Sequence, residues 1–261
     1  MLSFFSRTLR FAILLSLFAY LPLSSLALAQ ENPNPPKLVL GEDYRETFPP
    51  IKLQSDSDVP LEVAYFFWYG CGTCRKIDPA VNLYMKNLPS DVKFIRAPAA
   101  FTDNDLWVQH ARVFYALEIL GVEQKLHERV FMEIQDKGGM DPQGHAMAGL
   151  LNLQEFLNFA KNNNISAEDA EAAWNNNRIL IILQRTMAFL LNHDVKSVPT
   201  CIINGRYVVT VTRKGLGHFF ETIDTLLNQE RQALAKKATP LPAEDTPPAQ
   251  ETPPAEKAPS E

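Results

Sequence analysis

The feature that most constrains this chain is an apolar, aromatic segment that runs directly into two cysteines. Residues 66–70 have the sequence FFWYG, and Cys71-Gly72-Thr73-Cys74 follows at once. Beyond the second cysteine, apolar residues recur at helical spacing on one face: Ile77, Val81, Tyr84, Met85 and Leu88. The pattern predicts a buried strand that ends at a glycine, followed by a helix whose first turn contains both cysteines.

This position makes the two cysteines chemically unequal. The first N–H groups of a helix have no partner within the helix, and the helix dipole is positive there. A cysteine at that point loses its proton more easily, and the thiolate is the species that attacks disulfides. The second cysteine lies one turn further on, close enough to form a disulfide with the first. We therefore expect Cys71 to be the nucleophile and Cys74 the resolving thiol.

Two other roles for the pair, a structural disulfide and half of a zinc site, are less well supported. Tetrahedral zinc needs two more ligands, and the chain has no second Cys-x-x-Cys and no closely spaced histidine pair. We expect no metal and no cofactor. The remaining cysteine, Cys201, is expected to be a small buried core residue rather than a third redox thiol. Surface or capping roles are expected for the five scattered histidines: His110, His127, His145, His193 and His218.

The first 29 residues resemble a secretory signal. Arginines at positions 7 and 10 precede an apolar core at 11–21, and Ala27-Leu28-Ala29 fits the small-x-small cleavage pattern. We expect cleavage near Gln30 and export to the periplasm. An uncleaved membrane anchor is the alternative, but a proline and two serines at 22–25 interrupt the apolar run. Export matters because disulfides persist outside the cytosol.

The other end of the chain has a different composition. Residues 239–261 contain seven prolines and almost no large apolar side chain, so we expect 238–261 to be a disordered Pro-rich tail. The net charge of the whole chain is −5. No basic cluster suggests a nucleic-acid partner.

Between these ends, the hydrophobic patterns alternate between strand and helix signals. Val- and aromatic-rich runs predict strands at 61–69 and 92–95, and 200–211 is predicted to be a hairpin with a two-residue turn at Asn204-Gly205. Leu216–Lys237 is predicted to be a helix. The long interval between the second strand and the hairpin has helical spacing only. Helices are predicted at 107–120, 123–135, 153–160 and 177–191, and a further helix is predicted to begin after Ser166 as its N-cap and to extend to Trp174. The chain is therefore expected to be α/β, with an all-helical subdomain inserted into a mixed sheet.

At this point the chain resembles the DsbA family of secreted thiol–disulfide oxidoreductases. The resemblance extends over roughly residues 42–235 and depends on four motifs that occur in the family's order. They are the 66–74 segment with its cysteines, Ala172-Ala173-Trp174-Asn175, Val198-Pro199 directly before a strand, and Asn204-Gly205-Arg206-Tyr207.

The resemblance implies a thioredoxin fold with an inserted all-helical subdomain. It further implies that Pro199 is cis and faces the cysteine pair, and that Val198 beside it contacts the substrate backbone. The implied substrates are reduced proteins, and the implied oxidant is a DsbB-like membrane partner. We expect a monomer. The expected division is a signal peptide (1–29), an N-terminal extension (30–41), two parts of a thioredoxin-like domain (42–102 and 195–237) around a helical insertion (103–194), and the tail.

Two positions depart from the family pattern. The best-known active-site sequence of the family is Cys-Pro-His-Cys, whereas Gly72-Thr73 stands between the cysteines here. Because Thr73 has no positive charge, a milder oxidant is expected. The family also often has a buried acid six residues before the first cysteine, and that position is Tyr65. Glu62 is the nearest acid, and its place near the strand start suggests a solvated side chain.

The primary functional hypothesis is an exported thiol–disulfide oxidoreductase that donates a Cys71–Cys74 disulfide to folding proteins. One alternative is a disulfide reductase or isomerase, which works from the dithiol form. After cleavage of the signal, the mature chain is expected to have too few residues before Gly41 for an N-terminal dimerisation domain, which disfavours the isomerase. An alternative from another class is a peptide-binding chaperone whose cysteines are incidental.

Overall fold

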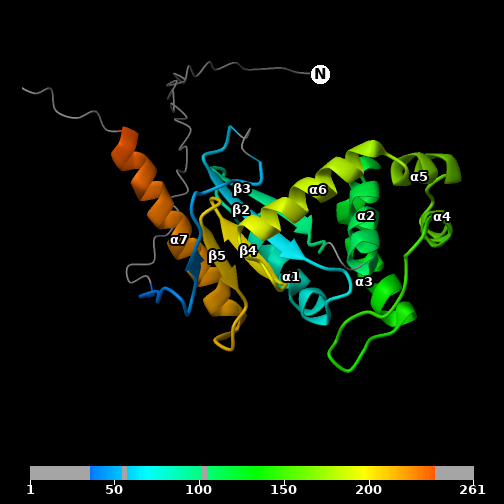
Figure 1. The fold of residues 1–261 in the computed structure, drawn as a ribbon, viewed down its shortest axis with the longest axis horizontal. Helices are drawn as coiled ribbons and strands as arrows, with labels where there is room; N and C mark the ends of the chain where they lie inside the picture. The colour runs from blue at the N-terminus through cyan, green and yellow to red at the C-terminus, as the bar shows by residue number, and fades with distance from the viewer. Residues whose placement is uncertain (1–35, 55–57, 102–104, 239–261) are drawn as a thin grey trace, which may run out of the picture. The chain divides into compact units, whose positions relative to one another are not determined.

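The computed structural model describes residues 36–54, 58–101 and 105–238 of the 261-residue chain. The predicted signal peptide and the segment from Thr239 onward lie outside these residues. The described part contains a mixed sheet with the strand order β1-β5-β4-β2-β3 (Figure 1). Its strands are β1 (Arg45–Glu46), β2 (Leu61–Phe67), β3 (Val92–Pro98), β4 (Thr200–Ile203) and β5 (Tyr207–Thr210). Only the β2–β3 pair is parallel among these strands.

Strand β2 is buried on both faces, which explains its unbroken apolar sequence. Successive side chains of a strand point to opposite faces of the sheet. Tyr65 and Phe67 therefore belong to the same core cluster as α1 and α7. Phe66 points the other way and stacks on Phe189 of α6, with 5.6 Å between ring centroids.

Two helices pack against the first of these faces. Helix α1 (Gly72–Lys86) follows β2 directly, and the predicted apolar face packs on the core, with Ile77 and Val81 buried. Helix α7 (Gly215–Ala238) ends the described part of the chain and contributes Phe219 and Ile223 to the same cluster. Helix α7 agrees closely with its predicted range of Leu216–Lys237.

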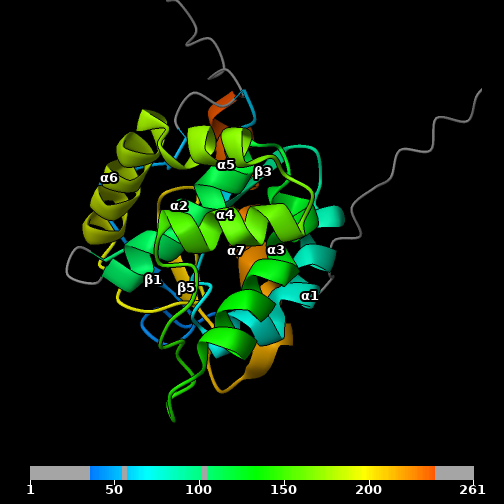
Figure 2. The same cartoon turned by 90° about the vertical axis from the view of Figure 1, so that its right-hand side faces the viewer.

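The segment between β3 and β4 is helical, as predicted. It contains α2 (Asp105–Ile119), α3 (Glu123–Met132), α4 (Leu153–Asn162), α5 (Ala167–Trp174) and α6 (Asn177–Asn192). The predicted N-cap is confirmed, because the Ser166 hydroxyl accepts a hydrogen bond from the Asp169 N–H at the start of α5. Figure 1 shows α2 to α5 on one side of the sheet, and Figure 2 views these helices from that side. The α/β class with an all-helical insertion is thereby confirmed.

The turn predicted at Asn204-Gly205 forms, because the Arg206 N–H donates to the Ile203 carbonyl oxygen at 2.9 Å and both central residues have positive φ. Strand pairing resumes at Ile203 and Tyr207, so the loop between the paired strands also includes Arg206. The backbone at Ile51 lies against this loop so closely that a Cβ added at Gly205 would clash with the Ile51 carbonyl oxygen. In addition, α3 does not simply end near residue 135 but continues into a π-helical turn, η1 (Glu133–Lys137).

Candidate active site

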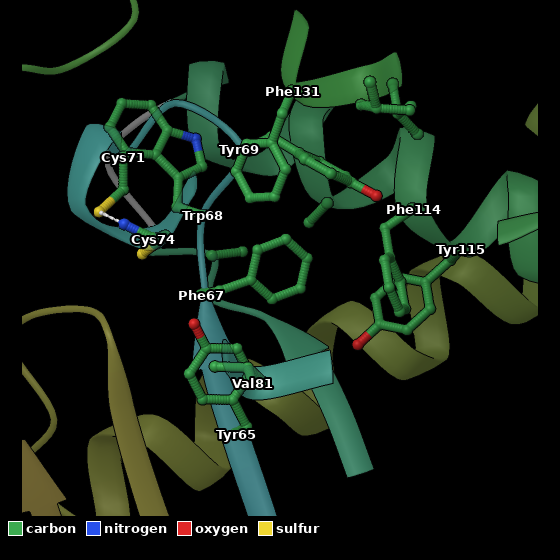
Figure 3. Packing of buried hydrophobic residues seen from close by; sticks show 14 of the residues in the cluster. Tyr65, Phe67, Trp68, Tyr69, Cys71, Cys74, Val81, Phe114, Tyr115 and Phe131 are labelled. Carbon is green, nitrogen blue, oxygen red and sulfur yellow. Dashed lines mark hydrogen bonds between the residues drawn. The ribbon is translucent and has the colours of Figure 1, made fainter. Parts of the chain in front are cut away.

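Cys71 is the N-cap residue of α1. Its backbone is extended (φ −92°, ψ 114°), and its Sγ accepts a hydrogen bond from the backbone N–H of Cys74 at 3.1 Å. Figure 3 shows this bond at the end of β2, beside Trp68 and Tyr69. The predicted arrangement, with both cysteines in the first helical turn, is therefore confirmed.

The two thiols of this turn differ in acidity. Hydrogen bonding with the Cys74 thiol lowers the pKa of Cys71, and the N–H groups of Cys74 and Thr73 lower it further, while partial burial opposes them. Complete burial of Cys74 raises its pKa well above the usual value, and its interactions with Cys71 add to the effect. Both cysteines are free thiols in the structure. The thiolate of the pair thus forms at Cys71.

The loop before β4 brings the predicted proline motif to the same place. The Val198–Pro199 peptide bond is cis, as the resemblance implied. The Cys71 thiol lies 3.8 Å from the carbonyl oxygen of Val198. The structure therefore places Val198-Pro199 beside the cysteine pair, although the two segments are more than a hundred residues apart in the sequence.

A loop from the helical insertion closes the other side of the redox turn. Its Ala146 N–H donates to the Gly70 carbonyl oxygen at 2.7 Å, and its Gly144 carbonyl oxygen accepts from the Gly72 N–H at 2.9 Å. Cys71 and His145 are paired in an isolated antiparallel bridge. Thr73 remains exposed. The sequence alone gave no indication of this pairing.

Trp68 is held by a buried histidine. Its indole N–H donates to Nδ1 of His110 at 2.9 Å, and Trp107 stacks on the indole with 4.0 Å between ring centroids. Because Nδ1 accepts, the proton is on Nε2, which donates to the Gly149 carbonyl oxygen at 2.8 Å. Burial lowers the pKa of His110 to about 4, so the ring is neutral. The expected surface or capping role was wrong for His110, because α2 turns this side chain toward the end of β2.

The expectation was also wrong for His127, which is buried in a polar cluster beneath the active site. His127 contacts the Tyr69 hydroxyl at 2.8 Å through Nδ1, and its two nitrogens lie 3.0 Å from Glu123 and 3.2 Å from Asp78. Arg96 lies 3.4 Å from Asp78 and 3.7 Å from Glu123. Burial raises the pKa of Asp78, but His127 and Arg96 outweigh burial and the net shift is downward.

The remaining histidines agree with the expectation. His193 is the C-cap residue of α6, although its side chain is buried. His145 is exposed on the loop from the helical insertion, and its Nδ1 lies 3.4 Å from Asp141. His218 is partly exposed and pairs with Asp43 at 2.7 Å.

The expectations for Tyr65 and for Glu62, the nearest acid, have different outcomes. Tyr65 does occupy the predicted buried position, where its hydroxyl has no hydrogen-bond partner in the described part of the chain. Burial, followed by the nearby Cys74, raises the Tyr65 pKa well above its usual value. The solvated side chain expected for Glu62 is wrong: it is only 2% exposed, and its carboxylate accepts from the N–H groups of Leu53 and Gln54 at 2.8 and 3.0 Å. The segment before β2 folds over this carboxylate.

Cys201 lies in the sheet, opposite Tyr65 across the β2–β4 pair. It is fully buried, and burial raises its pKa far above the usual value. This confirms the expected core role. Among the described residues, no cluster of three or more histidine, cysteine or acidic side chains could hold a metal ion. No helix in the same part of the chain is long and apolar enough to cross a membrane.

The sheet, the cysteine pair at the start of α1 and the cis proline beside it define the class of thioredoxin-fold thiol–disulfide oxidoreductases. No family model matches the sequence. The chain is 30% identical over 174 residues to the thiol:disulfide interchange protein DsbA of Pseudomonas syringae pv. tomato, covering 66% of this chain and 76% of that protein. The Azotobacter vinelandii DsbA is 27% identical over 226 residues, which is 86% of this chain and the whole of the relative.

Solved structures agree with these relatives. The crystal structure of Pseudomonas aeruginosa DsbA superposes with a TM-score of 0.67 at 26% identity, covering 76% of this chain and 97% of that one. The Xylella fastidiosa oxidoreductase DsbA gives a TM-score of 0.62, also at 26% identity, with 76% and 100% covered. The chain belongs to the DsbA family of thiol:disulfide interchange proteins and has its thioredoxin fold with an inserted helical subdomain.

Proposed function

We propose that this protein is an exported oxidase that donates a Cys71–Cys74 disulfide to reduced, folding proteins. The observation that supports this most strongly is the hydrogen bond from the Cys74 N–H to Cys71 Sγ, together with the burial of Cys74. An oxidant is strong when its reduced form is stabilised, and a stabilised thiolate is the usual means. The geometry stabilises a thiolate at Cys71.

The proposed cycle begins with the Cys71–Cys74 disulfide. A substrate thiolate attacks Cys71 Sγ, the bond to Cys74 breaks, and Cys74 leaves as a thiolate that takes up a proton. The high pKa of buried Cys74 favours this protonation. A second substrate thiolate then attacks the substrate sulfur of the mixed disulfide, and Cys71 leaves as the thiolate. Two electrons have passed from the substrate dithiol to the cysteine pair.

In this proposal Val198 and Pro199 bind the substrate backbone beside the reacting sulfurs. Support comes from the 3.8 Å approach of Cys71 Sγ to the Val198 carbonyl oxygen, since an extended peptide attached to Cys71 would pass along this loop. The active-site dipeptide, Gly72-Thr73, would tune the cysteine pair. No cofactor takes part in these steps.

The proposed location is the periplasm, reached through cleavage of the 1–29 signal. A DsbB-like membrane oxidant would remove the two electrons and restore the disulfide. We also propose the domain division derived from the sequence, in which 42–102 and 195–237 form the thioredoxin-like domain around the 103–194 insertion. The protein would act as a monomer.

The test is stoichiometric oxidation of a reduced two-cysteine peptide by the disulfide form of the purified protein. One equivalent should oxidise one equivalent of peptide. Cys74→Ser should accumulate a mixed disulfide with the peptide through Cys71, whereas Cys71→Ser should not. Trapping through Cys74 instead would reverse the assignment of the nucleophile.

Cys201→Ser is the matched control, because the Cys201 thiol is buried in the sheet. It should oxidise the peptide as the wild type does. If the protein prevents aggregation of unfolded chains equally well after Cys71 and Cys74 are both replaced, the result would support the peptide-binding chaperone. Failure to oxidise the peptide, combined with efficient reduction of disulfide substrates, would support the reductase.

A further inference from the structure

One buried side chain from the helical insertion reaches the backbone of the redox turn. Gln135 is only 6% exposed, and its Nε2 donates to the Tyr69 carbonyl oxygen at 2.7 Å and to the Cys71 carbonyl oxygen at 3.2 Å. One amide group thus holds the residues on either side of Gly70. The Cys71 carbonyl oxygen also accepts the Arg75 N–H of α1, at 3.1 Å.

The π-helical turn η1 explains how Gln135 arrives there. A π-helical turn contains an extra residue and changes the direction of the side chains that follow, and such turns are frequent at functional sites. Gln135 points from η1 to the strand end, while the next residue, Asp136, pairs with Arg75 of α1 at 2.5 Å. Two adjacent residues of η1 therefore contact the redox turn from its two ends.

We propose that Gln135 is a positioning residue for the redox turn: its amide fixes the Cys71 peptide so that the Cys71 sulfur faces the N–H of Cys74. The inference rests on the proposed function of the pair. Without the amide, the Tyr69 carbonyl group loses this donor and the Cys71 carbonyl group keeps only the Arg75 N–H, so the turn is held less firmly and the 3.1 Å bond between the Cys74 N–H and Cys71 Sγ weakens. The reduced form is then less stabilised, and the pair becomes a weaker oxidant.

The charged and titratable groups around Cys71 are Cys74 and Arg75 of α1, Asp136 of η1 and His145 of the neighbouring loop. A change at Gln135 leaves all of them in place. A shift in Cys71 chemistry would then report the geometry of the turn rather than a lost charge.

The experiment compares the wild type with Gln135→Met, which keeps the length of the side chain and removes its donor. The readouts are thiolate absorbance against pH and the equilibrium of the cysteine pair with glutathione. We expect the pKa of Cys71 to rise. The glutathione equilibrium should shift about threefold to tenfold toward the oxidised protein, which is the effect of losing one or two hydrogen bonds. Gln135→His, whose Nε2–H can reach a similar point, should restore most of both values.

Gln154→Met is the matched control, because the Gln154 amide bonds only the neighbouring Asn158 on the surface of α4. It should change neither readout. If Gln135→Met does not fold, Gln135→Asn keeps a buried amide that is one methylene too short and should give the same direction of shift. Lower thermal stability with an unchanged Cys71 titration and glutathione equilibrium would overturn the proposal. A wild type whose disulfide form fails to oxidise a reduced two-cysteine peptide would instead refute the proposed function.

Discussion

The chain has three cysteines in three different environments, and the environment decides what each sulfur can do. Cys71 caps a helix and accepts an N–H, Cys74 is enclosed within the first turn, and Cys201 is enclosed within the sheet. Only the first environment lowers a thiol pKa. Trp68, which precedes the pair, is held by a hydrogen bond to the neutral ring of His110.

His110 should make the stability of the fold depend on pH. Its pKa is lowered from 6.5 to about 4, so between these values the unfolded chain binds a proton that the folded chain does not. The free energy of unfolding should therefore fall as the pH falls through this window, by up to about 3 kcal/mol. His110→Gln, which can accept from Trp68 and donate to Gly149, should remove this part of the dependence. Urea unfolding at several pH values measures it.

The control for this prediction is His145→Gln, at an exposed histidine of the neighbouring loop. It should leave the pH dependence as in the wild type. An equally steep decline in the His110→Gln protein would mean that other groups cause it.

At the scale of the elements, the start of α1 is paired with the loop from the helical insertion. Gly72 is the first residue of the helix, a position where proline is ordinarily favoured. Here its N–H donates to Gly144, and a Cβ at this position would lie 3.0 Å from the Gly144 carbonyl oxygen. A proline would remove this hydrogen bond and crowd the loop. Introducing Pro-His at Gly72-Thr73 would therefore mix two effects, and only the exposed Thr73 offers a clean test of charge.

Thr73→His should lower the Cys71 pKa by about half a unit when the introduced histidine is protonated, because a positive charge stabilises the thiolate across a solvent-exposed gap. The disulfide should become correspondingly more oxidising. Thiolate absorbance and the glutathione equilibrium measure the two effects, and Thr73→Asn is the neutral control. Equal shifts in both variants would show that the charge at this position does not control the pair.

At this scale, local patterns predicted β2, the helices and the Ser166 N-cap of α5, because each depends on hydrophobic spacing or on a nearby residue. Gln135, His110 and the loop at Gly144 were not identified as site residues. They reach the redox turn from segments that are distant in the sequence. In addition, a π-helical turn lacks the regular apolar spacing by which an α-helix is recognised in a sequence. Glu62 was misjudged for a different reason: the fold of the nearby backbone at Leu53 and Gln54, whose N–H groups bind its carboxylate, leaves no signal in the hydrophobic pattern.

At the scale of the whole described molecule, a buried polar cluster joins the thioredoxin-like part to the helical insertion. Asp78 comes from α1, Arg96 from β3, and Glu123 and His127 from α3. The Arg96 side chain is only 6% exposed and lies near both carboxylates. The insertion is thus fixed to the sheet by charge as well as by the apolar core.

Arg96→Met should destabilise the protein by about 3–5 kcal/mol, because it leaves two carboxylates in a buried site without their cation. Chemical denaturation followed by circular dichroism measures the loss. Arg129→Met is the control, since Arg129 is an exposed residue of α3 that bonds Asn163. It should cost no more than about 1 kcal/mol. Similar losses in both variants would contradict a structural role specific to the buried cluster.

The equilibrium of the Cys71–Cys74 pair with glutathione, measured on the wild type, tests most directly whether the geometry of the pair stabilises its reduced form. We expect a single two-electron couple that is more oxidising than glutathione, so that at equilibrium with glutathione the pair is largely reduced unless oxidised glutathione is in large excess. The Cys201→Ser variant should give the same equilibrium constant. A disulfide that persists in excess reduced glutathione would contradict the role of an oxidase, because it would mean that the N-cap geometry of Cys71 does not stabilise the reduced form.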